Sequence, residues 1–116
     1  MPAIGMDLPV VFSRKFTKSR LWDVTRKYDC TIFNLLGGMT SAIYSEPLKE
    51  NDTDNPVRMV ISAGMPAIIW KKFEERFDLK VIELYAAVDG YGLFINYGDG
   101  PIGSFGKMPE ESEFKI

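Results

Sequence analysis

The 116-residue sequence contains no histidine and a single cysteine, Cys30. Histidine is the commonest general base and the commonest metal ligand in proteins, so its absence excludes Ser-His-Asp and Cys-His nucleophile systems within this chain. A zinc site is not expected with one thiol and no imidazole. Because one cysteine cannot form an internal disulfide, we expect a reducing, cytoplasmic setting.

Long hydrophobic runs and an excess of positive charge are also missing. No apolar stretch approaches the ~18 residues that a membrane-spanning helix needs, and residues 1–9 lack the basic start and the apolar segment of a signal peptide. The net charge is −2. The densest basic stretch, residues 14–27, is interrupted by apolar side chains, as on a solvated helix face. We therefore expect neither a membrane span nor nucleic-acid binding.

Hydrophobic residues make up 46% of the sequence, which is enough to build the core of one domain over residues 1–116. Apolar periodicity and turn residues predict three helices, at residues 18–28, 39–45 and 66–77. They predict strands at residues 9–12, 31–36, 57–61 and 81–85. Thr17 is expected to cap the first helix, and Pro66 to occupy the first position of the last one. Residues 49–56 are polar and predict a surface loop.

The order β-α-β-α-β-α-β over residues 9–85 predicts an α/β fold, with a mostly parallel sheet and helices on both faces. Residues 86–116 have a different composition, with glycines that punctuate short apolar runs. This part predicts a motif loop followed by irregular or antiparallel β structure. Within it, residues 98–103 match the dinucleotide pattern G-x-G-x-x-G, but they include a proline and no helix-forming stretch follows, so the match has no functional meaning.

Ligands of open parallel sheets bind outside the carboxyl ends of the strands. Three predicted strand ends, at residues 34–38, 62–66 and 85–90, are rich in glycine or alanine, which lets a flat ligand approach the backbone closely. Glycines after strands are also common turn formers, so each signal alone is weak. We expect the three segments to converge at one mouth, where a planar base could lie against Tyr85.

Several short segments together resemble a known family. They are, in chain order, residues 31–34 (TIFN), 56–58 (PVR), 62–66 (SAGMP), 73–77 (FEERF), 83–85 (ELY) and 103–107 (GSFGK). The chain resembles the adenylate-forming, AMP-binding acyl-CoA synthetases, above all the carnitine, bile-acid and fatty-acid-transport-protein-like CoA ligases. The resemblance covers roughly residues 9–116 and an internal part of the large N-terminal domain. It implies ATP, Mg²⁺ and CoA as cofactors and a carboxylic acid as the substrate.

The resemblance also implies roles for individual residues. Residues that match the segment lining the adenine and acyl pocket are Ala63, Gly64 and Met65. Residues that match the start of the family's Tyr-Gly-x-Thr-Glu motif, whose tyrosine packs on adenine, are Glu83, Leu84, Tyr85, Ala86 and Ala87. Residues that match positions near the acyl group are Phe33, Asn34 and Gly38.

The motif departs from the family pattern at its catalytic end, where Val88 stands for the threonine and Asp89 for the glutamate. Val88 cannot donate a hydrogen bond to phosphate, a loss of roughly 0.5–1.5 kcal/mol. Asp89 keeps the carboxylate that would hold Mg²⁺, on a side chain one carbon shorter. A shift on the order of 1 Å to reach the same metal can cost about a hundredfold in rate.

Three hypotheses follow. The first is a piece of an acyl-CoA ligase that contributes adenine and acyl pocket walls and is inactive alone, because the family's phosphate loop would precede residue 1 and its ribose-binding aspartate would follow residue 116. The second is a non-catalytic nucleotide- or acyl-binding module with a degenerate motif. The third is an interaction domain, in which uncovered sheet edges and apolar surface promote self-association.

Overall fold

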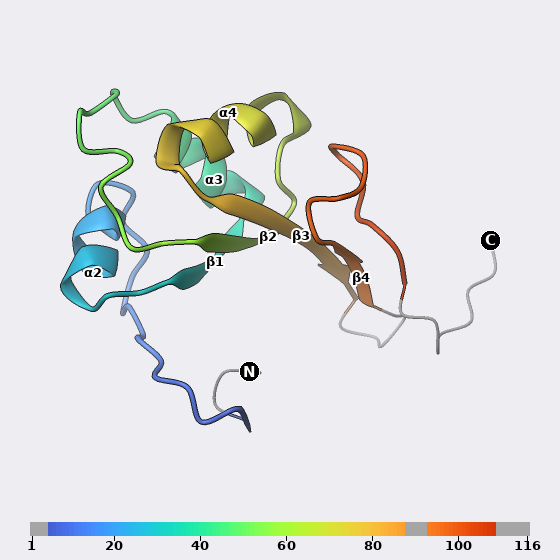
Figure 1. The fold of residues 1–116 in the computed structure, drawn as a ribbon, viewed down its shortest axis with the longest axis horizontal. Coiled ribbons are helices and arrows are strands. Elements are labelled where there is room, and N and C mark those ends of the chain that lie inside the picture. The colour runs from blue at the N-terminus through green and yellow to red at the C-terminus, as the bar shows by residue number, and fades with distance from the viewer. Residues whose placement is uncertain (1–4, 88–92, 109–116) are drawn as a thin grey trace.

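A computed structural model describes residues 5–87 and 93–108 and contains one four-stranded sheet (Figure 1). The strands lie in the order β1-β2-β3-β4. Their bounds are Ile32–Leu36 for β1, Met59–Ala63 for β2, Lys80–Ala86 for β3 and Leu93–Asn96 for β4. β1, β2 and β3 run parallel, and β4 pairs antiparallel with β3. The predicted α/β class with a mostly parallel sheet, followed by antiparallel β structure, is therefore confirmed.

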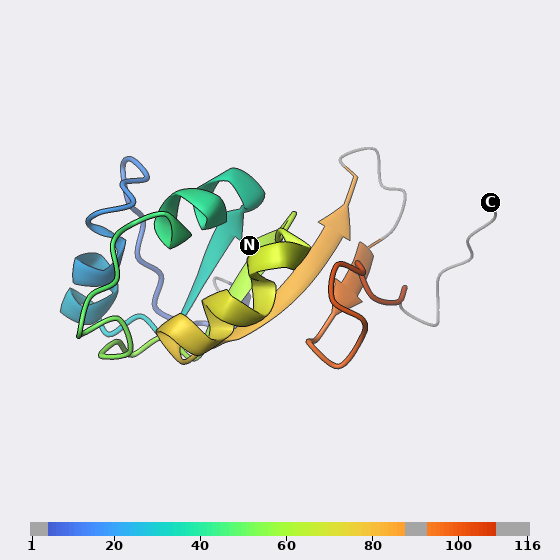
Figure 2. The same cartoon turned by 90° about the horizontal axis from the view of Figure 1, so that it is seen from above.

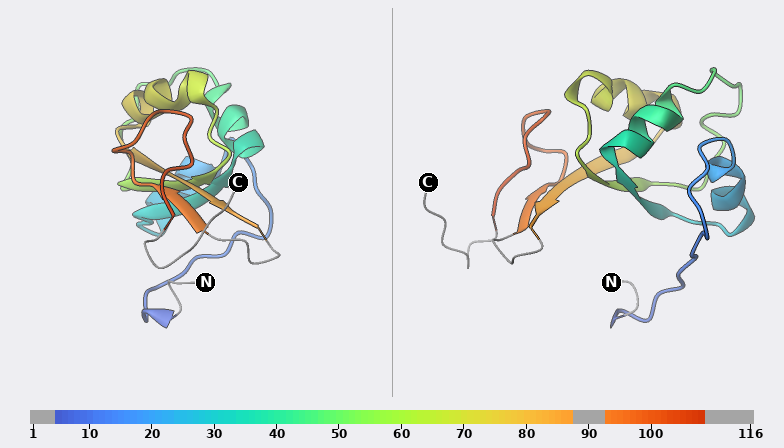
Figure 3. Two further views of the ribbon diagram at one scale, coloured as in Figure 1. Left: turned by 90° about the vertical axis from the view of Figure 1, so that its right-hand side faces the viewer. Right: turned by 180° about the vertical axis from the view of Figure 1, so that it is seen from behind.

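Among the described residues, the helices that accompany the sheet are α2 (Leu21–Lys27), α3 (Gly37–Tyr44) and α4 (Ala67–Phe77). α3 and α4 pack against each other and against the same face of the sheet, while α2 lies at the amino-terminal end of β1 (Figures 1 and 2). Seen end-on, no helix of the described residues covers the opposite face (Figure 3). The sequence predicted helices on both faces; the second layer is not found in the part of the chain that the structure describes.

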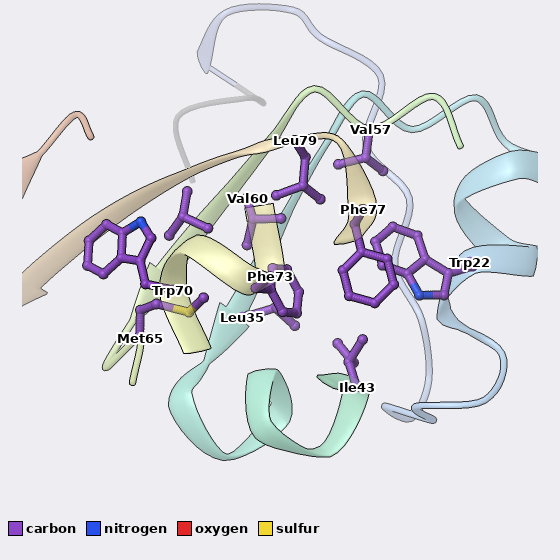
Figure 4. Packing of buried hydrophobic residues seen from close by; sticks show 11 residues of the cluster. Trp22, Leu35, Ile43, Val57, Val60, Met65, Trp70, Phe73, Phe77 and Leu79 are labelled. Carbon is purple, nitrogen blue, oxygen red and sulfur yellow. The ribbon is translucent and has the colours of Figure 1, made fainter. Parts of the chain in front are cut away.

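The hydrophobic core lies between the sheet and the helices α3 and α4 (Figure 4). Trp70, Phe73 and Phe77 form the buried side of α4, as the predicted helical spacing requires. The ring of Trp22 from α2 stacks on Phe77, with 4.5 Å between centroids, and closes the end of the core. Along β2, Val60 is fully buried in this core, so alternate residues of the strand point to the opposite face.

The prediction of a strand at residues 9–12 is wrong. These residues form neither strand nor helix, and Val11 and Phe12 are 43% and 67% exposed. A short apolar run becomes a strand only where a neighbouring strand supplies backbone partners, and residues 9–12 have none among the described residues. Thr17 is also not the helix cap, because α2 begins at Leu21 after a turn in which the Arg20 N–H donates to the Thr17 carbonyl (3.1 Å).

The other boundaries lie within three residues of their predicted positions. α3 begins at Gly37 rather than at 39, and β2 begins at Met59 rather than at 57. Pro66 is the N-cap of α4 instead of its first helical residue, since its backbone is extended (φ −66°, ψ 122°). No helix among the described residues has the length and apolar character needed to span a membrane.

The polar loop predicted at residues 49–56 is held on the protein by two arginines. The Arg76 guanidinium donates to Asp52 Oδ2 (2.8 Å) and to the carbonyls of Tyr44 (2.8 Å) and Pro47 (2.9 Å). Arg26 donates to two backbone carbonyls of the same loop. The Arg76–Asp52 ion pair is nearly buried, with both side chains 9% exposed. A loop without secondary structure is thus fixed by side chains from α2 and α4.

Cys30 has an environment that suppresses its reactivity. Partial burial, followed by the charge of the Asp29 carboxylate, raises the pKa of the Cys30 thiol. Because the thiolate is the nucleophile, we expect iodoacetamide to modify the folded chain more slowly at pH 8 than the urea-unfolded chain, with the rate rising as the pH increases. Asp29→Asn should speed the reaction of the folded chain. Mass-spectrometric time courses would measure this; equal rates for the folded and unfolded chains would contradict it.

Candidate functional site

The carboxyl ends of β1 and β2 meet backbone to backbone. Leu36 at the end of β1 pairs with Ala63 at the end of β2. Immediately after these strands, Gly37 lies so close to the Gly64 carbonyl that a Cβ atom at Gly37 would overlap it. Gly64 adopts a left-handed conformation (φ +87°), which favours glycine. Gly37 therefore allows an approach that a side chain would prevent, while Gly64 supplies the backbone conformation of the turn.

Glu83 of β3 organises the turn after β2. Its side chain is buried, and the whole residue is only 2% exposed. The Gly64 N–H donates to Glu83 Oε1 (2.5 Å), and the Met65 N–H donates to Oε2 (3.0 Å). The carboxylate thus uses both oxygens to hold the backbone that leads into α4. Register explains the contact, because Glu83 pairs with Ser62 of β2, two residues before this turn.

Tyr85 presents an exposed aromatic ring near the end of β3. The residue is 47% exposed and lies on the same side of the strand as Glu83, since side chains two apart share a face. Its ring centroid is 5.1 Å from that of Phe105 and 6.1 Å from that of Phe94. The carboxyl end of β3 therefore carries a group of three aromatic rings with accessible surface.

Asn96 is a site-forming residue that the sequence interpretation missed. It is 1% exposed, and its side chain binds the loop that follows β4. Asn96 Oδ1 accepts from the Gly98 N–H (2.9 Å) and the Gly100 N–H (3.2 Å), and Nδ2 donates to the carbonyls of Pro101 (3.1 Å) and Ser104 (3.0 Å). The G-x-G-x-x-G match lies in this loop, and its glycines serve the turn. The loop places Phe105 beside Tyr85.

Three of the predicted site residues lie elsewhere. Phe33 packs in the core, where its ring meets Trp22 edge-on at 5.7 Å. Asn34 is in the middle of β1 rather than at its end, and it is exposed on the helix-free face. Met65 points into the core beside Trp70, so only its backbone belongs to the turn (Figure 4). Alternation of side chains along β1 determines the positions of Phe33 and Asn34.

The remaining predicted residues fall into two groups. Ala63, Gly64, Glu83 and Tyr85 lie at the shared end of β2 and β3, where Gly37 joins them in place of Gly38. Gly38 is exposed, with open space around it. Leu84 and Ala86 share the face opposite Tyr85, and Ala87 follows the strand. The expected convergence therefore holds for Gly37 after β1, Gly64 after β2 and Glu83 of β3, but not for Asn34.

No family profile matches the chain. It is similar to long-chain fatty acid transport protein 6 of Homo sapiens, with 36% identity over 98 residues that make up 84% of this chain. Long-chain fatty acid transport protein 1 of Homo sapiens is 35% identical over 100 residues, or 85% of this chain. The fold is similar to that of a benzoate CoA ligase from Burkholderia xenovorans LB400, with a TM-score of 0.73 and 15% identity over 89% of this chain and 22% of the ligase.

The chain belongs to the adenylate-forming acyl-CoA synthetases. It spans about 16% of the length of the fatty acid transport proteins that it matches. A Mycobacterium tuberculosis fatty acyl CoA synthetase shares the fold, with a TM-score of 0.68 and 20% identity over 82% of this chain and 20% of the synthetase. The resemblance seen in the sequence is thereby confirmed at the level of the family.

Two of the family's motif positions lie outside the described residues. Val88 and Asp89, to which the resemblance assigns phosphate and magnesium contacts, are both in residues 88–92. Among the residues that the structure does describe, no group of three or more acidic or thiol side chains could hold a metal ion. Neither position is therefore assigned a geometry, and both assignments stay predictions.

Proposed function

We propose that this chain forms part of the nucleotide and acyl pocket of an ATP-dependent acyl-CoA ligase. In that reaction a carboxylate oxygen attacks the α-phosphorus of ATP and pyrophosphate leaves. The thiol of CoA then attacks the acyl carbon, and AMP leaves. The observation that supports this role is the exposed Tyr85 ring on the face of β3 that also carries Glu83, whose carboxylate holds the Gly64 turn at the carboxyl ends of parallel strands.

The residues present suit an adenine base better than they suit its phosphates. An exposed aromatic ring offers a stacking surface for a planar base. In contrast, the N–H groups of Gly64 and Met65, which a turn could offer to phosphate, already donate to Glu83. Phosphate contacts would come from other parts of the enzyme, and Asp89 would hold the Mg²⁺ that neutralises the phosphate charge.

We further propose a hydrophobic carboxylic acid as the substrate, with a long-chain fatty acid as the first candidate. The names of the relatives support this choice. The chain alone is expected to release no pyrophosphate, because its own residues supply one part of the pocket. A panel of carboxylates with ATP and Mg²⁺, followed by a pyrophosphate assay, tests this directly, and turnover by the isolated chain would contradict the proposal.

Binding provides the sharper test. Isothermal calorimetry with AMP, CoA and a non-hydrolysable acyl-AMP should detect a complex with acyl-AMP. Tyr85→Ala should weaken that complex about five- to hundredfold, which corresponds to the loss of one base-stacking contact. Tyr28→Ala is the matched control, because Tyr28 is similarly exposed (53%) but ends α2. Flat traces with all three compounds, or equal losses for the two variants, would contradict the proposal.

A further inference from the structure

We propose that Glu83 is a positioning residue, which acts on the ligand by fixing the turn at Gly64 and Met65. This inference rests on the proposed function, because the turn matters only if a ligand lies beside it. The resemblance placed Glu83 among the nucleotide contacts. In the structure the carboxylate has different partners, since both of its oxygens accept hydrogen bonds from backbone N–H groups of the chain itself.

Burial and charge support this assignment. Glu83 is 2% exposed, and the described residues place no cation within ion-pair distance of it. A buried carboxylate needs hydrogen-bond donors, and here two adjacent backbone amides supply them. These amides precede α4, a helix with no acidic residue in its first turn and no side-chain cap. The glutamate therefore fixes the two residues that lead into the N-cap Pro66, and its hydrogen bonds hold the entry to α4 rather than the first turn of the helix.

The turn needs hydrogen bonds from a side chain outside it, because its backbone conformation is unfavourable for most residues. Gly64 has a left-handed backbone, and its carbonyl lies against Gly37 of the neighbouring segment. Met65, the next residue, turns its side chain into the core while Gly64 stays exposed. One buried carboxylate accepts a hydrogen bond from each of two adjacent amides and so sets both peptide units at once. Loss of Glu83 should thus release the backbone of this turn.

The experiment compares three variants of the chain. Glu83→Ala removes both acceptors, Glu83→Gln keeps one oxygen and the shape of the side chain, and Val81→Ala is the control. Val81 is fully buried on the same strand and face, two residues from Glu83, so its truncation lowers stability without touching the turn. Amide hydrogen exchange at Gly64 and Met65, measured by NMR, reports the turn. Calorimetry with acyl-AMP reports the ligand.

We expect exchange at both amides to accelerate in Glu83→Ala, at one of them in Glu83→Gln, and at neither beyond the global change in Val81→Ala. Affinity for acyl-AMP should fall about tenfold in Glu83→Ala, which corresponds to about 1.4 kcal/mol of binding free energy, and less in Glu83→Gln. The inference would be overturned if amide exchange in Glu83→Ala matched that in Val81→Ala. It would also be overturned if exchange accelerated while the affinity for acyl-AMP stayed unchanged. If the unmodified chain binds no nucleotide, the proposed function fails, and the exchange data alone decide whether Glu83 holds the turn.

Discussion

Replacing Arg76 by leucine is expected to lower the free energy of unfolding by about 3–5 kcal/mol, the cost of removing one partner from a buried ion pair. Arg76 donates to Asp52 and to two backbone carbonyls, and its guanidinium also lies 4.8 Å from the Phe77 ring centroid. Leucine supplies the apolar volume but no donor. The Asp52 carboxylate, 7% exposed as a residue, would be left with the Lys49 N–H.

Urea denaturation followed by circular dichroism would measure this effect. Arg58→Leu is the matched control, because Arg58 is exposed and its side chain makes no ion pair among the described residues. The double variant Arg76→Leu, Asp52→Leu should recover part of the loss, since it leaves no unpaired buried charge. A loss below about 1 kcal/mol, similar to that of an exposed arginine, would show that packing alone holds the loop at residues 49–56.

Gly37→Ala and Gly38→Ala are expected to change stability in opposite directions. Both residues begin α3, where alanine should gain about 0.5–1 kcal/mol over glycine on helix propensity alone. A Cβ at Gly38 would meet nothing within 4 Å, so Gly38→Ala should realise that gain. At Gly37 the new atom would overlap the Gly64 carbonyl, a backbone group that no rotamer change can move. Overpacking typically costs about 1–3 kcal/mol, so the net effect at Gly37 should be a loss.

Thermal unfolding of the two variants and of the unmodified chain would show whether the melting temperature rises in one variant and falls in the other. Gly37→Ala should also weaken acyl-AMP binding, because the overlap would push the turn at Gly64 away from β1. Gly38→Ala should leave that binding unchanged only if Gly38 lies outside the pocket, as its open surroundings indicate. Stabilisation by both substitutions would contradict the prediction, because it would mean that the ends of β1 and β2 can move apart without loss of stability.

The sequence was most informative where one local signal determined the outcome. The four-residue spacing of Ile69, Phe73 and Phe77 predicted α4 almost to the residue, and the β-branched run at residues 31–36 predicted β1. The strand at 9–12 failed because pairing depends on a partner far away in the sequence. Sequence alone also did not reveal which face of the sheet the helices would cover. A shift of one residue moves a side chain to the other face, which is why Phe33 and Asn34 were misplaced.

The site itself was partly predictable. Small residues after parallel strands and a tyrosine at a strand end marked Gly64 and Tyr85, and the family resemblance supported both. The role of Glu83 could not be read in the same way, because it binds a turn 19 residues away that strand register brings within reach. Asn96 binds the loop that directly follows its own strand. Glu83 pairs with Asn96 as well as with Ser62, so these polar side chains form one buried row across three strands. A polar residue inside an apolar strand is the signal that could have found them.

Because helices cover only one face of the sheet, neighbouring residues of a strand affect different properties of the chain. Val60 is buried beneath the helices, whereas Ile61, its neighbour in β2, lies on the helix-free face. Ile32 and Leu36 share that face and are 43% and 59% exposed. A mutational scan along this strand should consequently alternate, with every second change altering the melting temperature and the intervening ones altering how readily separate copies of the chain adhere to one another.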